Sequence, residues 1–232
     1  MDNSRTKNMI GQENFDLIQD KTVMIIGLGG VGGYACEALV RSGIGKVILI
    51  DNDKVDNSNI NRQIITTEKT IGKRKVEVMK ERLLSINPKL KIISYDVYFS
   101  EENIEQIFNE KIDYVVDAID TMSSKVALWK YCLGNNIKVI SCLGMARRLD
   151  PQKVFITKLS KTESDPMAKA LRSLARKNNV SLDIPVVFSK EKPLEISKAE
   201  KENLGSMIFV PATAGIICGY YIINDIIDIK DK

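Results

Sequence analysis

The sequence predicts an α/β protein built on a doubly wound, Rossmann-like, mostly parallel sheet. Short apolar runs rich in β-branched residues alternate with helical patterns of ten to fifteen residues through the first two thirds of the chain. This alternation is typical of βαβ units, whose strands lie parallel. A glycine-rich segment follows the first apolar run, and the alternation changes at about Asp150. We therefore expect a Rossmann-like core that carries a C-terminal elaboration.

The expected elements of the core alternate along the chain. Gly43 suits the end of the first helix, and Pro88 ends the helix before the third strand. The expected strands are 22–26, 46–51, 91–95, 113–117 and 138–142, and the expected helices are 31–42, 72–86, 101–108 and 123–133.

Beyond Asp150 we expect a different arrangement within the same domain, which spans 1–232. "KVFITKL" predicts a strand, "SDPMAKALRSLARK" a capped basic helix, and "IPVVFSKEKP" a strand and turn. The charged stretch 189–203 predicts a mobile loop. The charge-free stretch 207–223 is shorter than the ~20 residues of a membrane span, and Pro211 interrupts it. We interpret it as a helix buried against the sheet and expect no membrane contact. We expect residues 1–150 to form the nucleotide-binding core and 151–232 to complete the sheet and the substrate side.

Composition excludes several classes of chemistry. The chain has no histidine, so no Ser-His-Asp triad or Cys-His pair operates within it. Its four cysteines stand far apart, which disfavours structural zinc and suits a reducing cytosol. The N-terminal stretch is too polar for a signal peptide, so we expect a cytoplasmic protein. The net charge of +4 permits a nucleic-acid partner without arguing for one.

The segment "MIIGLGGVGG" carries a dinucleotide-binding pattern. Gly27 permits a tight strand-to-helix turn, Gly29 lets backbone N–H groups approach phosphate, and Gly32 lets helix and strand pack closely. Asp51 ends the second strand, where a carboxylate can bind a ribose hydroxyl. The pattern alone does not choose among NAD, FAD, S-adenosylmethionine and ATP.

The residues that follow favour triphosphate chemistry over hydride transfer. Arg62 and Lys75 supply cations that suit phosphates and a departing pyrophosphate. The fourth strand ends in "YVVDAIDTMSSK", and either Asp117 or Asp120 can hold Mg²⁺ at the strand's carboxyl edge. Each residue alone also fits an ordinary surface charge or a helix cap, but all of them face one crevice in a doubly wound sheet.

The stretch "GLGGVGGYACEALVRSGIGKVILIDNDKVDNSNINRQ", followed by Lys75 and Asp120, resembles the ThiF/MoeB/HesA superfamily of ATP-dependent adenylating enzymes, relatives of ubiquitin-activating enzymes. The resemblance implies that Asp51 binds the ribose, that Arg62 and Lys75 bind the phosphates, and that Asp120 binds Mg²⁺. It also implies a homodimer in which Arg5 enters the partner's ATP site. The implied ATP-binding residues are Gly27, Gly29, Gly30, Gly32, Asp51, Asp53, Asn59, Arg62 and Lys75; the implied catalytic residues are Arg5, Arg62, Lys75 and Asp120.

The second half of the chain resembles one branch of this superfamily. "DP" at 150–151, "KTESDPMAKALR" at 161–172 and "VFSKE" at 187–191 are similar to the branch that dehydrates threonylcarbamoyladenosine in tRNA. The resemblance implies that ATP adenylates the threonine carboxylate, and that the substrate then cyclises to an oxazolone. It implies the tRNA anticodon stem-loop as partner and leaves open a sulfur-trafficking protein partner. The candidate tRNA contacts are Arg147, Arg148, Arg172, Arg176 and Lys177.

Two other functions remain open from the sequence. One is an adenylyltransferase that activates the C-terminal carboxylate of a ubiquitin-like sulfur-carrier protein, although this chain lacks the four-cysteine zinc site of most such enzymes. The other is a non-catalytic nucleotide-binding module. A dehydrogenase ranks last, because nothing after Asp51 suits hydride transfer. For Cys142 and Cys218 we expect buried structural positions rather than a role in catalysis.

Overall fold

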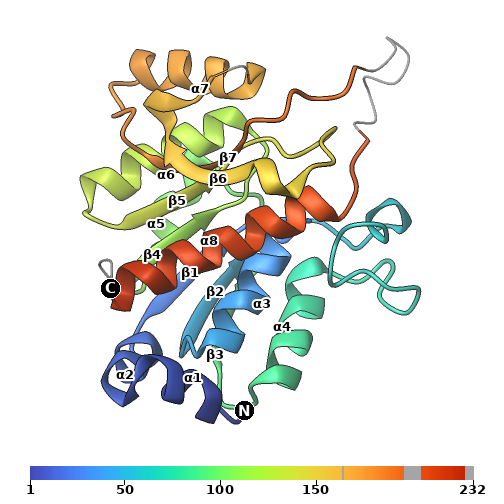
Figure 1. Ribbon diagram of the computed structural model, residues 1–232, viewed down its shortest axis with the longest axis vertical. Coiled ribbons are helices and arrows are strands. Elements are labelled where there is room, and N and C mark those ends of the chain that lie inside the picture. Colours follow the sequence, from blue (N-terminus) through green and yellow to red (C-terminus); the bar gives the residue numbers. More distant parts are fainter. Residues whose placement is uncertain (164, 196–204, 228–232) are drawn as a thin grey trace.

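The computed structural model describes residues 1–163, 165–195 and 205–227. This part of the chain forms one seven-stranded sheet in the order β3-β2-β1-β4-β5-β7-β6 (Figure 1). All neighbouring strands pair in parallel except β6, which runs antiparallel to β7. The strands are β1 (Thr22–Ile26), β2 (Lys46–Ile50), β3 (Lys91–Tyr95), β4 (Tyr114–Asp117), β5 (Lys138–Cys142), β6 (Val154–Lys158) and β7 (Pro185–Ser189). The mostly parallel α/β sheet predicted from the sequence is confirmed.

Helices cover both faces of the sheet, as Figure 1 shows, with α8 lying across the same face as α3 and α4. The helices of the first half are α1 (Ser4–Ile10), α2 (Gln12–Gln19), α3 (Gly32–Ser42), α4 (Lys75–Ile86) and α5 (Ile104–Ile107). Those of the second half are α6 (Met122–Gly134), α7 (Pro166–Lys177) and α8 (Phe209–Ile227). Short 3₁₀ turns occupy η1 (Asn57–Asn59), η2 (Glu101–Asn103), η3 (Pro151–Lys153) and η4 (Leu159–Lys161).

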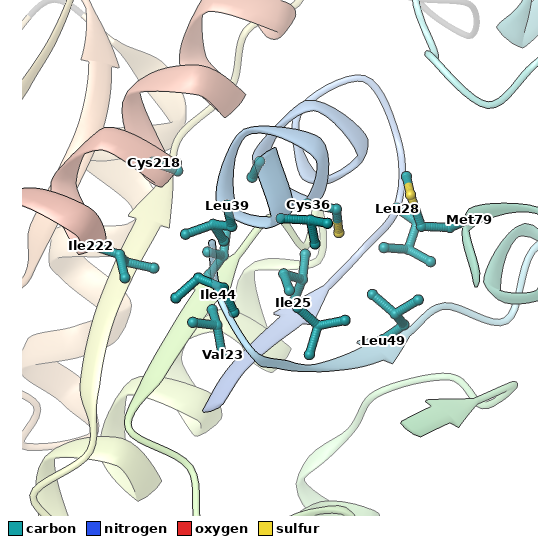
Figure 2. Packing of buried hydrophobic residues seen from close by; sticks show 14 of the residues in the cluster. Val23, Ile25, Leu28, Cys36, Leu39, Ile44, Leu49, Met79, Cys218 and Ile222 are labelled. Atoms are coloured by element: carbon teal, nitrogen blue, oxygen red, sulfur yellow. The ribbon is translucent and has the colours of Figure 1, made fainter. Parts of the chain in front are cut away.

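The alternation of side chains along β1 divides the interior into two cores. Val23 and Ile25 pack with α3, α4 and α8, whereas Met24 and Ile26 pack with α5, α6 and α7. Figure 2 shows the first core, in which Leu39 of α3 and Ile222 of α8 lie among the side chains of β1. Both faces of β1 are buried, which explains why its sequence is a nearly continuous apolar run.

The five strands expected in the core are present, and the helices differ mainly at their ends. The helix expected at 72–86 begins at Lys75, and the one at 101–108 divides into η2 and α5. Helices α1 and α2 were not predicted. Helix α1 has no buried residues, so its sequence carries no apolar periodicity to reveal it. The loop predicted at 189–203 falls mostly on 196–203, which lies outside the described residues.

Helix α8 confirms the buried helix predicted near the C-terminal end. By length and composition alone it could cross a membrane, but 56% of its apolar window is buried inside the fold. A β-carbon added to Gly215 would lie 2.2 Å from the carbonyl oxygen of Val31. The absence of a side chain at Gly215 therefore lets α8 pack directly against the beginning of α3.

The topology reverses between β1 and β4. From β1 the chain passes to β2 on one side, and it reaches β4 on the other side only after β3. Crossovers that leave in opposite directions open a crevice beyond the carboxyl ends of the two strands, where ligands bind in doubly wound proteins. Helices α1 and α2 precede β1 and so lie toward the opposite end of the sheet (Figure 1).

Candidate functional site

A cavity of about 630 Å³ lies at the β1–β4 reversal. Its walls come from the segments that follow the first four strands, and α4 contributes one side chain. The lining residues are Ile26, Gly27, Gly29, Gly30, Val31, Ile50, Asp51, Asn52, Asp53, Asn59, Arg62, Gln63, Lys75, Val97, Tyr98, Phe99, Ala118, Ile119, Asp120 and Thr121. The sequence-predicted ATP-binding residues therefore lie together, except for Gly32, which is buried beneath the loop.

The glycine-rich loop turns sharply into α3. Gly27 has φ +89°, and a β-carbon there would lie 2.6 Å from the carbonyl oxygen of Ala118. In the described part of the chain no side chain caps the N-terminus of α3, where Val31 is the N-cap residue. Gly33 N, in the first turn of the helix, donates to Gly29 O at 3.1 Å, and the helix dipole favours negative charge at this end.

The carboxylate of Asp51 is held at the end of β2 by two backbone groups. Its Oδ2 accepts a hydrogen bond from Leu28 N at 2.6 Å, and its Oδ1 accepts one from Asp53 N at 2.8 Å. Burial raises the pKa of Asp51 above its ordinary 3.8, while the charge of Lys75 and the two backbone hydrogen bonds act in the opposite direction. The carboxylate is therefore fixed in orientation before any ligand arrives.

Two cations reach the cavity from different elements. Lys75, at the first turn of α4, is 5% exposed, and its Nζ donates to Asp53 Oδ2 at 2.6 Å. Arg62 Nη1 donates to Ser58 O at 2.7 Å and to Asn61 Oδ1 at 2.9 Å. These contacts leave the remaining donors of the Arg62 guanidinium for an anionic ligand.

Asn59 supports the segment that carries Arg62. Its Oδ1 accepts from Asp56 N at 3.1 Å, while the Asp56 side chain accepts from Ser58 N at 2.8 Å. This reciprocal capping fixes η1, and Arg62 N then donates to Asn59 O at 3.1 Å. Asn59 is 8% exposed and also lines the cavity.

The geometry separates the two carboxylates at the end of β4. Asp120 is exposed and lines the cavity. Asp117 is fully buried, and its oxygens accept from Lys125 Nζ at 3.0 Å, Trp129 Nε1 at 2.8 Å and Ser141 Oγ at 2.6 Å. Of these two carboxylates, Asp120 is the one that can contact a ligand in the cavity. Among the described residues, no group of three or more Cys, Asp or Glu side chains forms a protein-only metal cage.

Three lining residues were not assigned a role from the sequence. The Tyr98 hydroxyl lies 3.0 Å from Thr121 Oγ1, which donates to Asp120 Oδ1 at 3.3 Å. Gln63 is 8% exposed, and its Oε1 has no hydrogen-bond partner among the described residues. Both Tyr98 and Thr121 follow the carboxyl ends of strands, and that position could have indicated them.

Arg5 is the predicted site residue that this chain does not bring to the cavity. It is exposed on α1, and the lining formed by the described residues does not include it. Its expected place in a partner's site remains a prediction.

The structure corrects one candidate tRNA contact and restricts another. Arg148 is 3% exposed, forms an ion pair with Asp165, and donates from Nε to Glu191 O at 2.9 Å, so it is not accessible to RNA. Arg172 is half-buried and donates from Nη1 to Thr162 O at 2.8 Å. The remaining candidates comprise Arg147, which is half-buried, and Arg176 and Lys177, which are exposed.

The cysteines match the expectation of buried structural positions. Cys36, Cys132, Cys142 and Cys218 are all buried and free. The neighbouring Cys142 thiol and burial raise the pKa of Cys218 well above its ordinary value. A neutral, enclosed thiol is a poor nucleophile.

Comparison with known proteins identifies the family. The model of the ThiF family matches residues 3–191. The chain belongs to the ThiF family. It is 38% identical to the tRNA threonylcarbamoyladenosine dehydratase of Bacillus subtilis, over 99% of this chain and 96% of that protein. It is 36% identical to the protein of the same name from Escherichia coli, over 80% and 72% of the two chains.

A solved structure of a ThiF-family relative shares the whole fold. The Escherichia coli tRNA N6-threonylcarbamoyladenosine dehydratase in complex with ATP superposes with a TM-score of 0.90 at 32% identity, over 97% of this chain and 93% of that one. The same protein in complex with AMP gives the same score and coverage. The similarity therefore extends to residues on both sides of Asp150.

Proposed function

We propose that this ThiF-family protein catalyses the ATP-dependent dehydration of threonylcarbamoyladenosine in tRNA to its cyclic oxazolone form. One observation carries the proposal: the similarity to enzymes of that name spans 99% of this chain and 96% of the Bacillus subtilis protein. A shared nucleotide-binding core alone would fit many activities, whereas similarity through residues 151–227 includes the part that distinguishes branches of the family.

The cavity fits ATP by its donor set. The N-terminus of α3, which no described side chain caps, and the cations Arg62 and Lys75 suit the phosphates, and the fixed carboxylate of Asp51 suits a ribose hydroxyl. The volume of about 630 Å³ lies within the range of small-molecule sites. Asp53 would hold Lys75 in place until phosphate oxygens compete for the ammonium.

Asp120 is the residue that would hold Mg²⁺ together with the phosphates. When bound, the ion would neutralise charge that develops on the phosphate oxygens. The exposure of Asp120 and its place on the cavity wall support this role, and among the described residues its carboxylate accepts from Thr121 Oγ1 through Oδ1, which leaves Oδ2 for a ligand.

The proposed reaction needs no nucleophile from the protein. An oxygen of the threonine carboxylate attacks the α-phosphorus of ATP, pyrophosphate leaves, and an acyl adenylate forms. The ureido group of the same substrate then closes on the acyl carbon; the bond to AMP breaks, AMP leaves, and a proton is released. The buried cysteines and the lack of histidine are consistent with this route, in which positioning and charge stabilisation supply the rate.

The assembly that we propose is a homodimer in which Arg5 of each chain completes the other chain's ATP site. Arg5 lies on α1 and is absent from the lining that the described residues form around its own chain's cavity, which supports a role in trans. We place the activity in the cytoplasm with tRNA as substrate. A sulfur-trafficking partner stays a prediction.

The proposal is tested by incubating tRNA that carries threonylcarbamoyladenosine with the protein, ATP and Mg²⁺, then analysing nucleosides by mass spectrometry under conditions that preserve the ring. The expected result is loss of one water from the nucleoside, with AMP and pyrophosphate released in equal amounts. An unchanged nucleoside with a folded, ATP-binding protein would overturn it. Pyrophosphate exchange driven by a small protein that ends in Gly-Gly would then indicate a carrier-activating enzyme, and no turnover with any partner would indicate a binding module.

A further inference from the structure

Asp117 and Lys125 form an ion pair that has no solvent exposure on either side chain. Lys125 Nζ lies 3.0 Å from Asp117 Oδ1, 3.2 Å from Ser141 Oγ and 2.8 Å from Cys142 O. The pair therefore ties the carboxyl end of β4 to the carboxyl end of β5 and to the second turn of α6. Burying two charges costs free energy that a pair of apolar side chains would not, so stability alone is a weak reason for it.

The same pair fixes the backbone that enters the cavity wall. Asp117 Oδ1 also accepts from Ile119 N at 3.1 Å, and Ala118 N donates to Ile26 O at 2.9 Å. Asp120 follows directly, and α6 begins at Met122. The segment 118–121 is thus anchored by Asp117 on one side and by α6, which carries Lys125, on the other.

We propose that Asp117 and Lys125 are positioning residues that hold segment 118–121, and through it the Asp120 carboxylate, in the geometry needed to bind the metal–nucleotide complex. This inference rests on the proposed function of Asp120. It gives Asp117 a different role from Asp120: the Asp117 carboxylate fixes the backbone of segment 118–121, and the Asp120 carboxylate contacts the ligand. Groups that orient metal ligands commonly change metal affinity by roughly tenfold or more when they are removed.

Two double variants separate positioning from simple loss of charge. Asp117→Ala with Lys125→Met removes both charges and leaves Ile119 N without its acceptor. Asp117→Asn with Lys125→Met also removes both charges but keeps an oxygen that can accept from Ile119 N. The new amide nitrogen takes the place of Oδ2, where it can donate to Ser141 Oγ, and both double variants leave Trp129 Nε1 without its acceptor. Neither variant contains an unpaired buried charge, so both avoid the main reason for misfolding.

The matched control lies at the other end of the same strand. The Tyr114 hydroxyl donates to Asp225 Oδ2 at 2.6 Å, and Tyr114→Phe removes that bond. Tyr114 does not line the cavity within the described part of the chain. This control loses a tertiary hydrogen bond of β4 without disturbing segment 118–121.

The experiment measures three quantities in each protein: Mn²⁺ affinity in the presence of a non-hydrolysable ATP analogue, affinity for the same analogue without metal, and hydrogen exchange of the Ile119 amide. In the Ala/Met variant we expect Mn²⁺ to bind roughly tenfold more weakly and Ile119 to exchange faster, with metal-free nucleotide affinity unchanged. The Asn/Met variant should recover most of both losses, and Tyr114→Phe should resemble the wild type. Equal Mn²⁺ affinity in the wild type and the Ala/Met variant would overturn the inference, as would an equal loss in both double variants.

If the Ala/Met variant does not fold, Ser141→Ala decides the question, because it removes one partner from each member of the pair without adding a charge. Weaker Mn²⁺ binding is then expected, and unchanged binding overturns the inference. These binding and exchange measurements do not depend on turnover. If the wild-type protein binds Mn²⁺ and the analogue but leaves modified tRNA unchanged, the proposed function is refuted. The binding and exchange measurements on the variants then still test the positioning role.

Discussion

The backbone of Gly32 lies against the carbonyl oxygen of Gly27, so that a β-carbon added to Gly32 would sit 1.8 Å from that oxygen. The two glycines lie at the two ends of the turn from β1 into α3. Because the two nearest atoms, the carbonyl oxygen and carbon of Gly27, belong to the backbone, the turn tolerates no side chain at position 32.

Gly32→Ala should therefore displace the glycine-rich loop and weaken ATP binding severely. Overpacking of this kind typically costs about 1–3 kcal/mol of folding stability. Isothermal titration and thermal unfolding measure the two effects. Gly134→Ala is the matched control, because Gly134 ends α6 with no atom within 4 Å of an added β-carbon. An ATP affinity for Gly32→Ala equal to that of the control would contradict the assignment of the loop.

Lys75→Gln tests the ammonium in the cavity wall. Hydrogen bonds to charged groups contribute about 1.5–3 kcal/mol, so ATP should bind roughly tenfold to a hundredfold more weakly. Its partner Asp53 is largely exposed, and loss of the ion pair should cost little stability. Lys69→Gln, at an exposed position outside the cavity lining, should leave affinity unchanged. If the substitution weakens AMP binding by the same factor as ATP binding, Lys75 does not contact the outer phosphates.

A tagged heterodimer of Arg5→Ala and Asp120→Ala chains tests whether Arg5 acts across the dimer. If each site combines Asp120 of one chain with Arg5 of the other, one site in the heterodimer is intact and about half of the wild-type activity should return. Each variant homodimer should be inactive. If Arg5 acts within its own chain, both sites of the heterodimer lack a residue and activity stays absent. Failure to recover any heterodimer with two tags would contradict the homodimer itself.

The strand pattern alone could place the residues whose position follows from the end of a parallel strand, whereas Asn59, Arg62 and Lys75 were placed by the family resemblance. Asp51, Asp120 and the glycines of the loop all follow such ends, and the βαβ rule brings those ends together. The sequence could not show which of Asp117 and Asp120 contacts the ligand, because the pattern at the end of the strand does not indicate which carboxylate is buried. That depends on Lys125 and Trp129, which approach Asp117 from α6.

Tertiary contacts also decided the features that the sequence left unassigned. The stretch "MARRLD" predicts that Arg148 is a surface cation. In the structure Arg148 is buried and forms an ion pair with Asp165, the N-cap residue of α7. Helix α1 has no buried residue and so shows no apolar period, whereas α2 buries Phe15 and Ile18 at helical spacing, a signal that the prediction from sequence did not use. Tyr98 lines the cavity beside Thr121, which belongs to another βα connection, and that neighbour is not apparent from the sequence.

Gly215→Ala tests the contact between α8 and the beginning of α3. An added β-carbon would lie 2.2 Å from Val31 O, so one helix must shift. We expect a loss of about 1–3 kcal/mol in the free energy of unfolding, with weaker ATP binding because Val31 lies on the cavity wall. Denaturant unfolding and ATP titration measure both. Ile216→Ala, on the exposed face of the same helix, should change neither appreciably; a similar loss in both variants would show that the helix as a whole, rather than the glycine contact, is responsible.

The basic residues of the C-terminal part should divide into two groups by their burial. Arg148→Ala leaves the carboxylate of Asp165 buried without its partner, and breaking a buried pair in this way typically costs about 3–5 kcal/mol. Arg176→Ala and Lys177→Ala remove exposed charges and should change stability by less than about 0.5 kcal/mol. If these two residues contact the tRNA backbone, each substitution should reduce the salt dependence of tRNA binding by about one counterion. Unfolding curves and tRNA binding at several salt concentrations measure these effects, and an unchanged salt slope in the double variant would remove Arg176 and Lys177 from the RNA-binding surface.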